Sequence, residues 1–331
     1  MRRTWLAAVL GGALVVRPMD VMAQTYLVVV SGIGGEPKYS QVFEEWCTTL
    51  VGAARDRFHL PDESIVYLAE SPGRHTDIAG KSTKQNVEGA LNDLATRAEP
   101  AARIFIVLVG HGSAVGGQMR FNLPGPDMTA EDFAAVLSRF PTQEIVFANL
   151  SSASGGFIPV LSGKRRAIVT ATKSGFERNE TIFPGHFVAA FAGDGADTDK
   201  DERVSVLEAF NYARREVARA YESENRLLTE HALLDDDGDG RGSTEPDPLT
   251  GDGGMAMRLF LHSPTQSAGV ISDPELAALY KGKEQLEQQL AALRSRKDEM
   301  AAELYQRQLE RLLLELARTS RAIREREGKQ P

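Results

Sequence analysis

The stretch "IFIVLVGHGSAVGG", residues 104–117, decides how the chain is expected to fold. Its first half is a continuous run of apolar β-formers, which is typical of a strand buried on both faces. The run ends at Gly110, and His111 and Gly112 follow in a glycine-rich turn. Functional side chains gather at the carboxyl ends of parallel strands, so this imidazole is a candidate functional group.

Similar apolar runs elsewhere in the chain alternate with amphipathic stretches. We expect strands over residues 25–35, 64–70, 103–110, 144–150, 166–174 and 255–263. Helices are expected around residues 43–51, after a Ser82–Gln85 capping box, and from Thr129 to Pro141. This alternation predicts an α/β fold with a mostly parallel sheet and helices on both faces.

The composition of the 331 residues is that of a globular protein, with 42% hydrophobic and 25% charged residues. A formal net charge of -8 argues against a nucleic acid as partner, because phosphate binding needs a basic surface. The single cysteine, Cys47, has no partner for a disulfide within the chain. It lies on the apolar face of the first expected helix, where we expect a small core residue.

The N-terminus has the pattern of a signal peptide. Arg2 and Arg3 precede an apolar stretch over residues 5–16, and Val21 and Ala23 fit a small-residue cleavage site. We expect residues 1–23 to be removed and the protein to be exported, to the periplasm or out of the cell. The stretch is too short for a stable transmembrane span, and an uncleaved anchor is the alternative.

Beyond an expected linker at residues 266–272, residues 273–331 are rich in Ala, Glu, Leu, Arg and Gln. Apolar residues recur there at heptad spacing: Leu279, Leu286, Leu290, Leu293, Met300 and Leu304, then after a phase slip Leu309, Leu313, Leu316 and Ile323. This pattern predicts a long helix in a coiled coil or a hairpin, able to form a homo-oligomer or to bind a partner helix. The alternative is an amphipathic helix folded back on the domain.

An acidic insert over residues 194–253 carries oxygen ligands at the spacing of calcium loops. In "DTDKDERVSVLE", residues 197–208, these ligands occupy EF-hand positions: Asp197, Asp199, Asp201, Ser205 and Glu208. Glu202 stands where such loops have glycine.

A second acidic stretch, "DDDGDGRGS" from residue 235, offers Asp235, Asp237 and Asp239, with Pro246 at the twelfth position. The two stretches predict Ca²⁺ binding, either as half-sites of one centre or as two weak sites. The alternative is a pair of solvated acidic loops.

The turn after the fourth expected strand, "ANLSSASGGF" at residues 148–157, is built from small residues that leave backbone amides accessible as an oxyanion hole. Together with residues 111–113, His-Gly-Ser, it resembles the legumain, caspase and gingipain group of cysteine peptidases, and legumain most of all. Residues 146–147 match the family's Val-Phe strand and residues 154–155 its Ser-Gly. Ser152 then stands at the position of the family's nucleophilic cysteine. The resemblance covers residues 24–265.

The resemblance implies a caspase–hemoglobinase-like fold, with His111 and position 152 as catalytic dyad and the Gly112 amide in the oxyanion hole. Two departures bear on function: Ser152 replaces the cysteine, and Ala153 replaces the glutamate after it. Residues 38–41, Lys-Tyr-Ser-Gln, replace the Asn-Tyr-Arg-His with which legumain-type enzymes help to bind the substrate side chain, so an asparagine-specific pocket is not supported.

A serine nucleophile needs an oriented base, usually with a carboxylate behind it, and no acid is identified for this by spacing. The sequence therefore predicts an exported, catalytically degenerate peptidase-like protein that binds a peptide or a protein. The alternative is an active hydrolase that uses Ser152 and His111. His186 and His231 are expected to be structural or surface residues.

Overall fold

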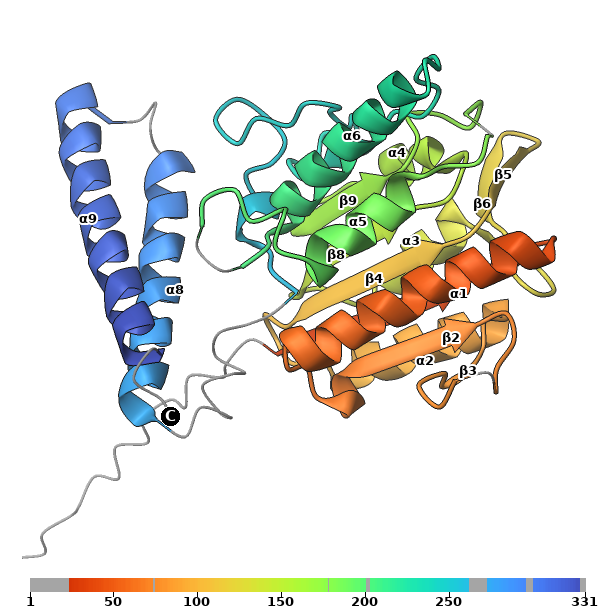
Figure 1. Ribbon diagram of the computed structural model, residues 1–331, viewed down its shortest axis with the longest axis horizontal. Helices are drawn as coiled ribbons and strands as arrows, with labels where there is room; N and C mark the ends of the chain where they lie inside the picture. Colours follow the sequence, from red (N-terminus) through yellow and green to blue (C-terminus); the bar gives the residue numbers. More distant parts are fainter. Residues whose placement is uncertain are drawn as a thin grey trace, which may run out of the picture.

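The computed structural model describes residues 24–73, 75–177, 179–200, 203–261, 273–295 and 300–327 (Figure 1). The expected signal peptide and the linker at residues 266–272 lie outside these ranges. At the centre is a seven-stranded sheet of order β10-β9-β8-β4-β1-β2-β3. Its strands are β1 (Thr25–Ser31), β2 (Ile65–Ala69), β3 (Gly80–Lys81), β4 (Arg103–Val109), β8 (Glu144–Asn149), β9 (Arg166–Thr170) and β10 (Leu233–Asp235).

Six of these strands pair in parallel, and β10 pairs antiparallel with β9. Every residue of β1 and β4 is buried, because helices cover both faces of the sheet (Figure 1). On one face lie α1 (Pro37–Gly52), α5 (Phe183–Ala192) and α6 (Val206–Ser223); on the other lie α2 (Lys84–Arg97), α3 (Ala130–Leu137) and α4 (Ile158–Leu161). The expected α/β class with a mostly parallel sheet is confirmed.

Alternate residues of the central strands enter the two cores. Leu27 and Phe105 pack into the core under α1, α5 and α6, whereas Val28 and Ile104 pack into the core under α2 and α3. This alternation follows from the period of two along a strand. It explains why the sequence reads as continuous apolar runs rather than as an apolar and polar alternation.

The starts of two helices test the expected capping residues. Thr129 caps α3 as expected, and its capping box is completed by Asp132. The cap of α2 is Thr83, whose side chain accepts the N–H of Asn86, so the expected Ser82–Gln85 box is wrong by one residue. Ser82 still donates its N–H to the carbonyl of Ala69, so the chain leaves the sheet one residue later than expected.

A small antiparallel sheet follows β4 directly. It contains β5 (Gly112–Val115), β6 (Gln118–Phe121) and β7 (Met128–Thr129) in the order β5-β6-β7. Gly116 and Gly117 form the two-residue turn between β5 and β6, and both have positive φ angles, 60° and 84°. Such turns favour glycine because its φ is unrestricted. His111 is thereby held between the large sheet and this hairpin.

The expected strand at residues 255–263 is wrong. The chain forms the short helix η4 (Ala256–Arg258), and beyond it Phe260 makes an isolated bridge to Ser205. The reason is that a residue distant in the sequence binds the backbone of this segment. The carboxylate of Asp236 accepts the N–H groups of Gly253, Met255 and Ala256. The last strand of the sheet is instead β10, whose three residues gave no recognisable pattern in the sequence.

The C-terminal segment forms two helices, α8 (Pro274–Ser295) and α9 (Ala302–Glu327), which pack side by side as a hairpin (Figure 1). Leu290, Leu293 and Leu312 form the apolar core of the hairpin. Arg326, near the end of α9, forms an ion pair with Asp273, which precedes α8.

The heptad positions of the second half of this segment shift relative to the expectation. Leu304 and Leu313, expected in the seam, are 41% and 43% exposed, whereas Leu312 is buried. Because α9 is a separate helix that begins at Ala302, it has its own heptad phase and packs Leu309, Leu312 and Leu316 against α8. Association of this hairpin with another chain stays a prediction. Among the described residues, none of the helices combines the length and the apolar character needed to span a bilayer.

Candidate active site

The structure brings His111 and Ser152 to one edge of the sheet. His111 lies two residues beyond the end of β4, and Ser152 lies three residues beyond the end of β8. These strands are parallel neighbours, with Leu108 in register with Asn149. Both therefore leave the sheet at the same edge, as expected for the carboxyl ends of adjacent parallel strands. The residue after His111 contacts Ser152: the amide nitrogen of Gly112 lies 3.3 Å from Oγ of Ser152.

The turn that carries Ser152 is fixed on both sides. Oδ1 of Asn149 accepts the N–H of Ser151 at 3.2 Å and its hydroxyl at 2.6 Å. Ala153 then has a left-handed backbone, with φ of 53°, and donates its N–H to the carbonyl of Glu177 at 2.8 Å. A left-handed residue with a Cβ costs about 1–2 kcal/mol. The turn therefore holds Ser152 in a strained backbone that neighbouring segments stabilise.

Gly112 is required by how closely its strand approaches this turn. A Cβ at Gly112 would lie 2.2 Å from the carbonyl oxygen of Ser152 and 2.7 Å from the hydroxyl of Ser151. No side chain fits at these distances. The glycine after His111 is thus explained by packing against the serine turn.

The hydroxyl of Ser152 is bound by backbone groups. It accepts the N–H of Gly112 at 3.3 Å and donates to the carbonyl of Gly112 at 3.4 Å. Within the described part of the chain, no hydrogen bond joins this hydroxyl to the ring of His111. A serine nucleophile is activated by a hydrogen bond to its base. The arrangement therefore lacks the contact that would activate Ser152, and the hydroxyl itself engages the amide expected to bind an oxyanion.

His111 is half-buried among aromatic rings. Its imidazole meets the rings of Tyr39 and Phe43 edge-on, with centroids 4.8 Å and 5.0 Å away. Burial lowers the pKa of His111, against smaller raising effects from the backbone of Gly34 and the charge of Glu180. The imidazole is therefore neutral near pH 7.

No carboxylate orients this ring among the residues that the structure describes. The backbone of Gly34 is the group hydrogen-bonded to His111. The nearby carboxylate of Glu180 instead accepts the hydroxyl of Tyr39 at 3.0 Å. Gly34 lies in the glycine-rich turn after β1, and its role was not predicted, because a backbone carbonyl leaves no mark in the sequence.

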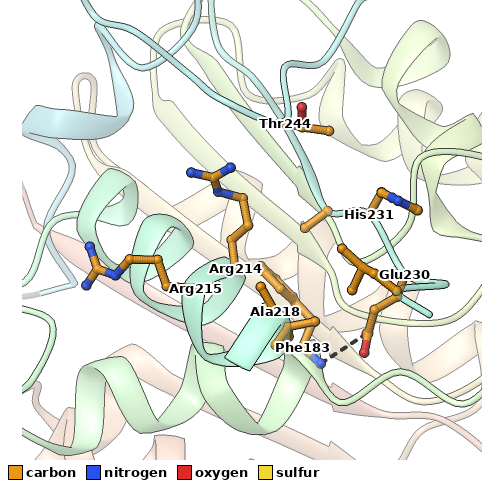
Figure 2. Close-up of a pocket in the computed structure, with 10 residues that line it drawn as sticks. Phe183, Arg214, Arg215, Ala218, Glu230, His231 and Thr244 are labelled. Atoms are coloured by element: carbon orange, nitrogen blue, oxygen red, sulfur yellow. Dashed lines mark hydrogen bonds between the residues drawn. The ribbon is translucent and has the colours of Figure 1, made fainter. Parts of the chain in front are cut away.

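A pocket of about 290 Å³ is lined by residues that include Phe183, Arg214, Glu230 and His231 (Figure 2). Its walls include α6 and the start of α5, where Glu230 accepts the N–H groups of Ile182 and Phe183 and so caps the helix. Burial raises the pKa of Glu230. Another wall residue, His231, has its Nδ1 2.6 Å from Oε1 of Glu177. Since the Glu177 carbonyl also binds Ala153, Glu177 connects this pocket to the serine turn, a role that sequence reasoning missed.

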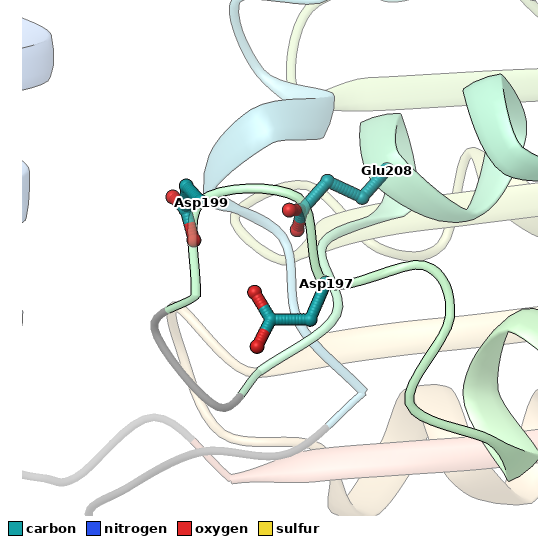
Figure 3. A group of neighbouring side chains, drawn as sticks. All are labelled: Asp197, Asp199 and Glu208. Carbon is teal, nitrogen blue, oxygen red and sulfur yellow. The ribbon is translucent and has the colours of Figure 1, made fainter.

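The first acidic stretch brings three carboxylates together, Asp197, Asp199 and Glu208 (Figure 3). One oxygen of each lies within 4.8 Å of the others. Glu208 also has a structural role, because it completes a capping box with Ser205, the N-cap of α6. Asp201 lies outside the described residues, and metal binding here stays a prediction.

The carboxylates of the second acidic stretch form a different group from the expected one. Oxygens of Asp235 and Asp237 lie within 4.8 Å of one another and of Asp252, which sequence reasoning missed. Asp239, expected to be a ligand, accepts the N–H of Arg241 at 2.7 Å within its own turn. Asp252 stands alone among glycines in the sequence, where nothing distinguishes it from an ordinary loop residue.

No protein-family model matches the chain, and no curated protein matches it. Among solved structures, drICE, a caspase, is similar with a TM-score of 0.39 and 10% sequence identity over 62% of this chain and 87% of that chain. Protein GSU0716 from Geobacter sulfurreducens is similar with a TM-score of 0.41 and 11% identity over 64% and 92%. These similarities are distant, so the function proposed for the site rests on its own geometry.

Proposed function

We propose that this protein is an exported, legumain- or caspase-like member of the peptidase fold whose catalytic centre is degenerate, and that it binds a peptide or protein segment at the edge carrying His111 and Ser152. The observation that carries the proposal is the hydroxyl of Ser152, which is bonded to the backbone of Gly112 and not to the His111 imidazole.

The chemistry of the two nucleophiles explains why this difference matters. A thiol with a pKa of about 8.5 becomes a thiolate beside an imidazole, so a cysteine and a histidine suffice. A serine hydroxyl is far less acidic and depends on direct contact with an oriented base. With a neutral His111, no bond to Ser152 and no carboxylate behind the ring, we expect binding without turnover.

Exposed apolar side chains beside the turn support a binding role. Phe176, in the loop that supports Ala153, is 88% exposed, and Val115, at the end of β5, is 51% exposed. The two segments touch, since a Cβ at Gly175 would lie 3.1 Å from the Cβ of Ala114. Phe176 and Val115 are each adjacent in sequence to one of these contacting residues, and exposed apolar groups that lie near each other are typical of interaction sites. We infer that they contact apolar side chains of the bound segment.

Peptide binding by the purified protein tests this proposal. We expect members of a diverse fluorescent peptide library to bind wild type, and Phe176→Ser and Val115→Ser to bind them at least about tenfold more weakly, a loss of roughly 1.4 kcal/mol. Leu249→Ser is the matched control, because Leu249 is 61% exposed in the acidic insert. Absence of binding, or an equal loss in the control, would contradict the proposal.

An active hydrolase is the second candidate, and one observation favours it. The Gly112 amide lies 3.3 Å from Oγ of Ser152, so a donor for an oxyanion is close to the nucleophile position. A ring movement that brings His111 to Ser152 would complete the dyad. Peptide cleavage by wild type distinguishes the two candidates.

A further inference from the structure

Three carboxylates on and around the last strand have the spacing of a cation site. Asp235 ends β10, Asp237 lies in the turn after it, and Asp252 lies in the segment before η4. One oxygen of each lies within 4.8 Å of the others. Because Ca²⁺ binds oxygens at about 2.3–2.6 Å, ligands on opposite sides of one ion are about 5 Å apart. The three oxygens therefore fit around a single ion.

One of these carboxylates is fully buried and incompletely bonded. Asp235 is 0% exposed; its Oδ1 accepts the hydroxyl of Ser162 at 3.0 Å, whereas its Oδ2 has no hydrogen-bond partner. Asp252 is only 6% exposed. In the described ranges, no lysine or arginine forms an ion pair with Asp235, Asp237 or Asp252. A buried carboxylate without a compensating charge is costly, and a bound cation would offset that cost.

The three carboxylates lie close enough to repel one another when they are charged, because like charges in a buried setting are weakly screened. Among the residues that the structure describes, no basic side chain pairs with them to offset this repulsion.

The neighbouring acidic residues do not share this condition. Both oxygens of Asp236 accept backbone N–H groups of the segment before η4. Both oxygens of Glu208 are hydrogen-bonded as well, to Thr198 and to Ser205. The unpartnered oxygen therefore singles out the group at Asp235.

We propose that Asp235, Asp237 and Asp252 bind one divalent cation of the Ca²⁺ type, which joins β10 to the segment before η4. All three ligands are hard carboxylate oxygens, the type of ligand that Ca²⁺ binds in flexible geometry. The site is independent of the proposed peptide-binding function, since it involves none of the residues of the serine turn.

Isothermal titration of Ca²⁺ into the full-length protein, stripped with EDTA, tests the site. We expect wild type to bind Ca²⁺ at submillimolar to millimolar concentration, roughly 10⁻⁴–10⁻³ M as in extracellular modules. The variants Asp237→Asn and Asp252→Asn keep the shape and the hydrogen-bond acceptor but remove a charge. Each is expected to weaken binding at this site by at least about tenfold.

Asp199→Asn is the matched control, because Asp199 belongs to the other acidic group. Loss of one equivalent of Ca²⁺ in Asp237→Asn and Asp252→Asn, but not in the control, would support the site. Asp237 is exposed, so Asp237→Asn is expected to fold even where Asp252→Asn does not. Absence of binding at millimolar Ca²⁺, or binding that only the control removes, would overturn the proposal.

Discussion

The serine turn and the carboxylate group at Asp235 are both built from buried polar side chains, but they differ in the kind of group that is left without a hydrogen-bond partner, a neutral amide in the first and a carboxylate oxygen in the second. The serine turn follows the carboxyl end of β8, whereas β10 runs antiparallel to β9 and leads toward the opposite edge, where Asp235 accepts the hydroxyl of Ser162, a residue before β9. In the turn, the hydroxyls of Ser151 and Ser152 are bonded within the fold. At the other edge, Oδ2 of Asp235 is left without a partner.

This difference indicates which site depends on a ligand for its own stability. Buried polar groups are normally satisfied, and each exception calls for an explanation. In the serine turn both serine hydroxyls are bonded, and the group left without a partner is the neutral amide nitrogen Nδ2 of Asn149 rather than an oxygen of an acid. The carboxylate group is incomplete, so we expect a cation to stabilise the fold itself.

The largest expected effect on stability is that of removing the Asp236 carboxylate, which, unlike the proposed cation ligands beside it, binds backbone N–H groups with both oxygens. Asp236→Ala removes the acceptor for three buried N–H groups, and we expect it to lower the free energy of unfolding by about 3–4 kcal/mol. Urea unfolding with EDTA present measures this loss without any contribution from a metal. Asp239→Ala is the control, with an expected loss of about 0.5 kcal/mol because Asp239 is exposed. Equal losses would mean that Asp236 does not hold the segment before η4.

A smaller effect tests how tightly the serine turn is packed. Gly112→Ala places a methyl group 2.2 Å from the carbonyl oxygen of Ser152, and we expect a loss of about 2–3 kcal/mol. Gly89→Ala is the matched control in α2, where nothing lies within 4 Å of the added Cβ. There we expect a gain of up to about 1 kcal/mol. A Gly112→Ala protein as stable as wild type would show that the turn and β5 are further apart than described.

The smallest expected effect concerns the protonation of His111. Burial lowers its pKa in the folded state, so the unfolded chain binds the proton more readily. Its contribution to stability is therefore present above a pH of about 6.5 and is lost as the pH falls through the lower, folded value. His111→Asn should flatten the fall in stability between neutral and acidic pH.

Urea unfolding across this pH range checks the effect, with His186→Asn as comparison. Burial lowers the pKa of His186 too, so the His186→Asn variant should retain the part of the pH dependence of stability that His111 causes. An unchanged slope in His111→Asn would place its imidazole in a more polar environment than the contacts with Tyr39 and Phe43 imply.

The sequence predicted the fold well where local patterns decide it. The apolar runs at β1 and β4 identified the central strands, and the parallel arrangement was sufficient to place His111 beside Ser152. It failed where distant residues decide. The stretch at residues 255–263 has the pattern of a strand, but the carboxylate of Asp236 accepts the N–H groups of Met255 and Ala256. Asp252 joins Asp235 only through the folded chain, so no spacing rule could find it.

Peptide cleavage tests the central claim most directly. Wild type, Ser152→Ala, Ser152→Cys and His111→Ala would be incubated with a diverse peptide library, and products would be followed by mass spectrometry. We expect no turnover by wild type, because Ser152 is bonded to Gly112 and not to His111. Turnover gained only by Ser152→Cys would support a degenerate centre with intact geometry. Turnover by wild type that is lost in both Ser152→Ala and His111→Ala would contradict the account.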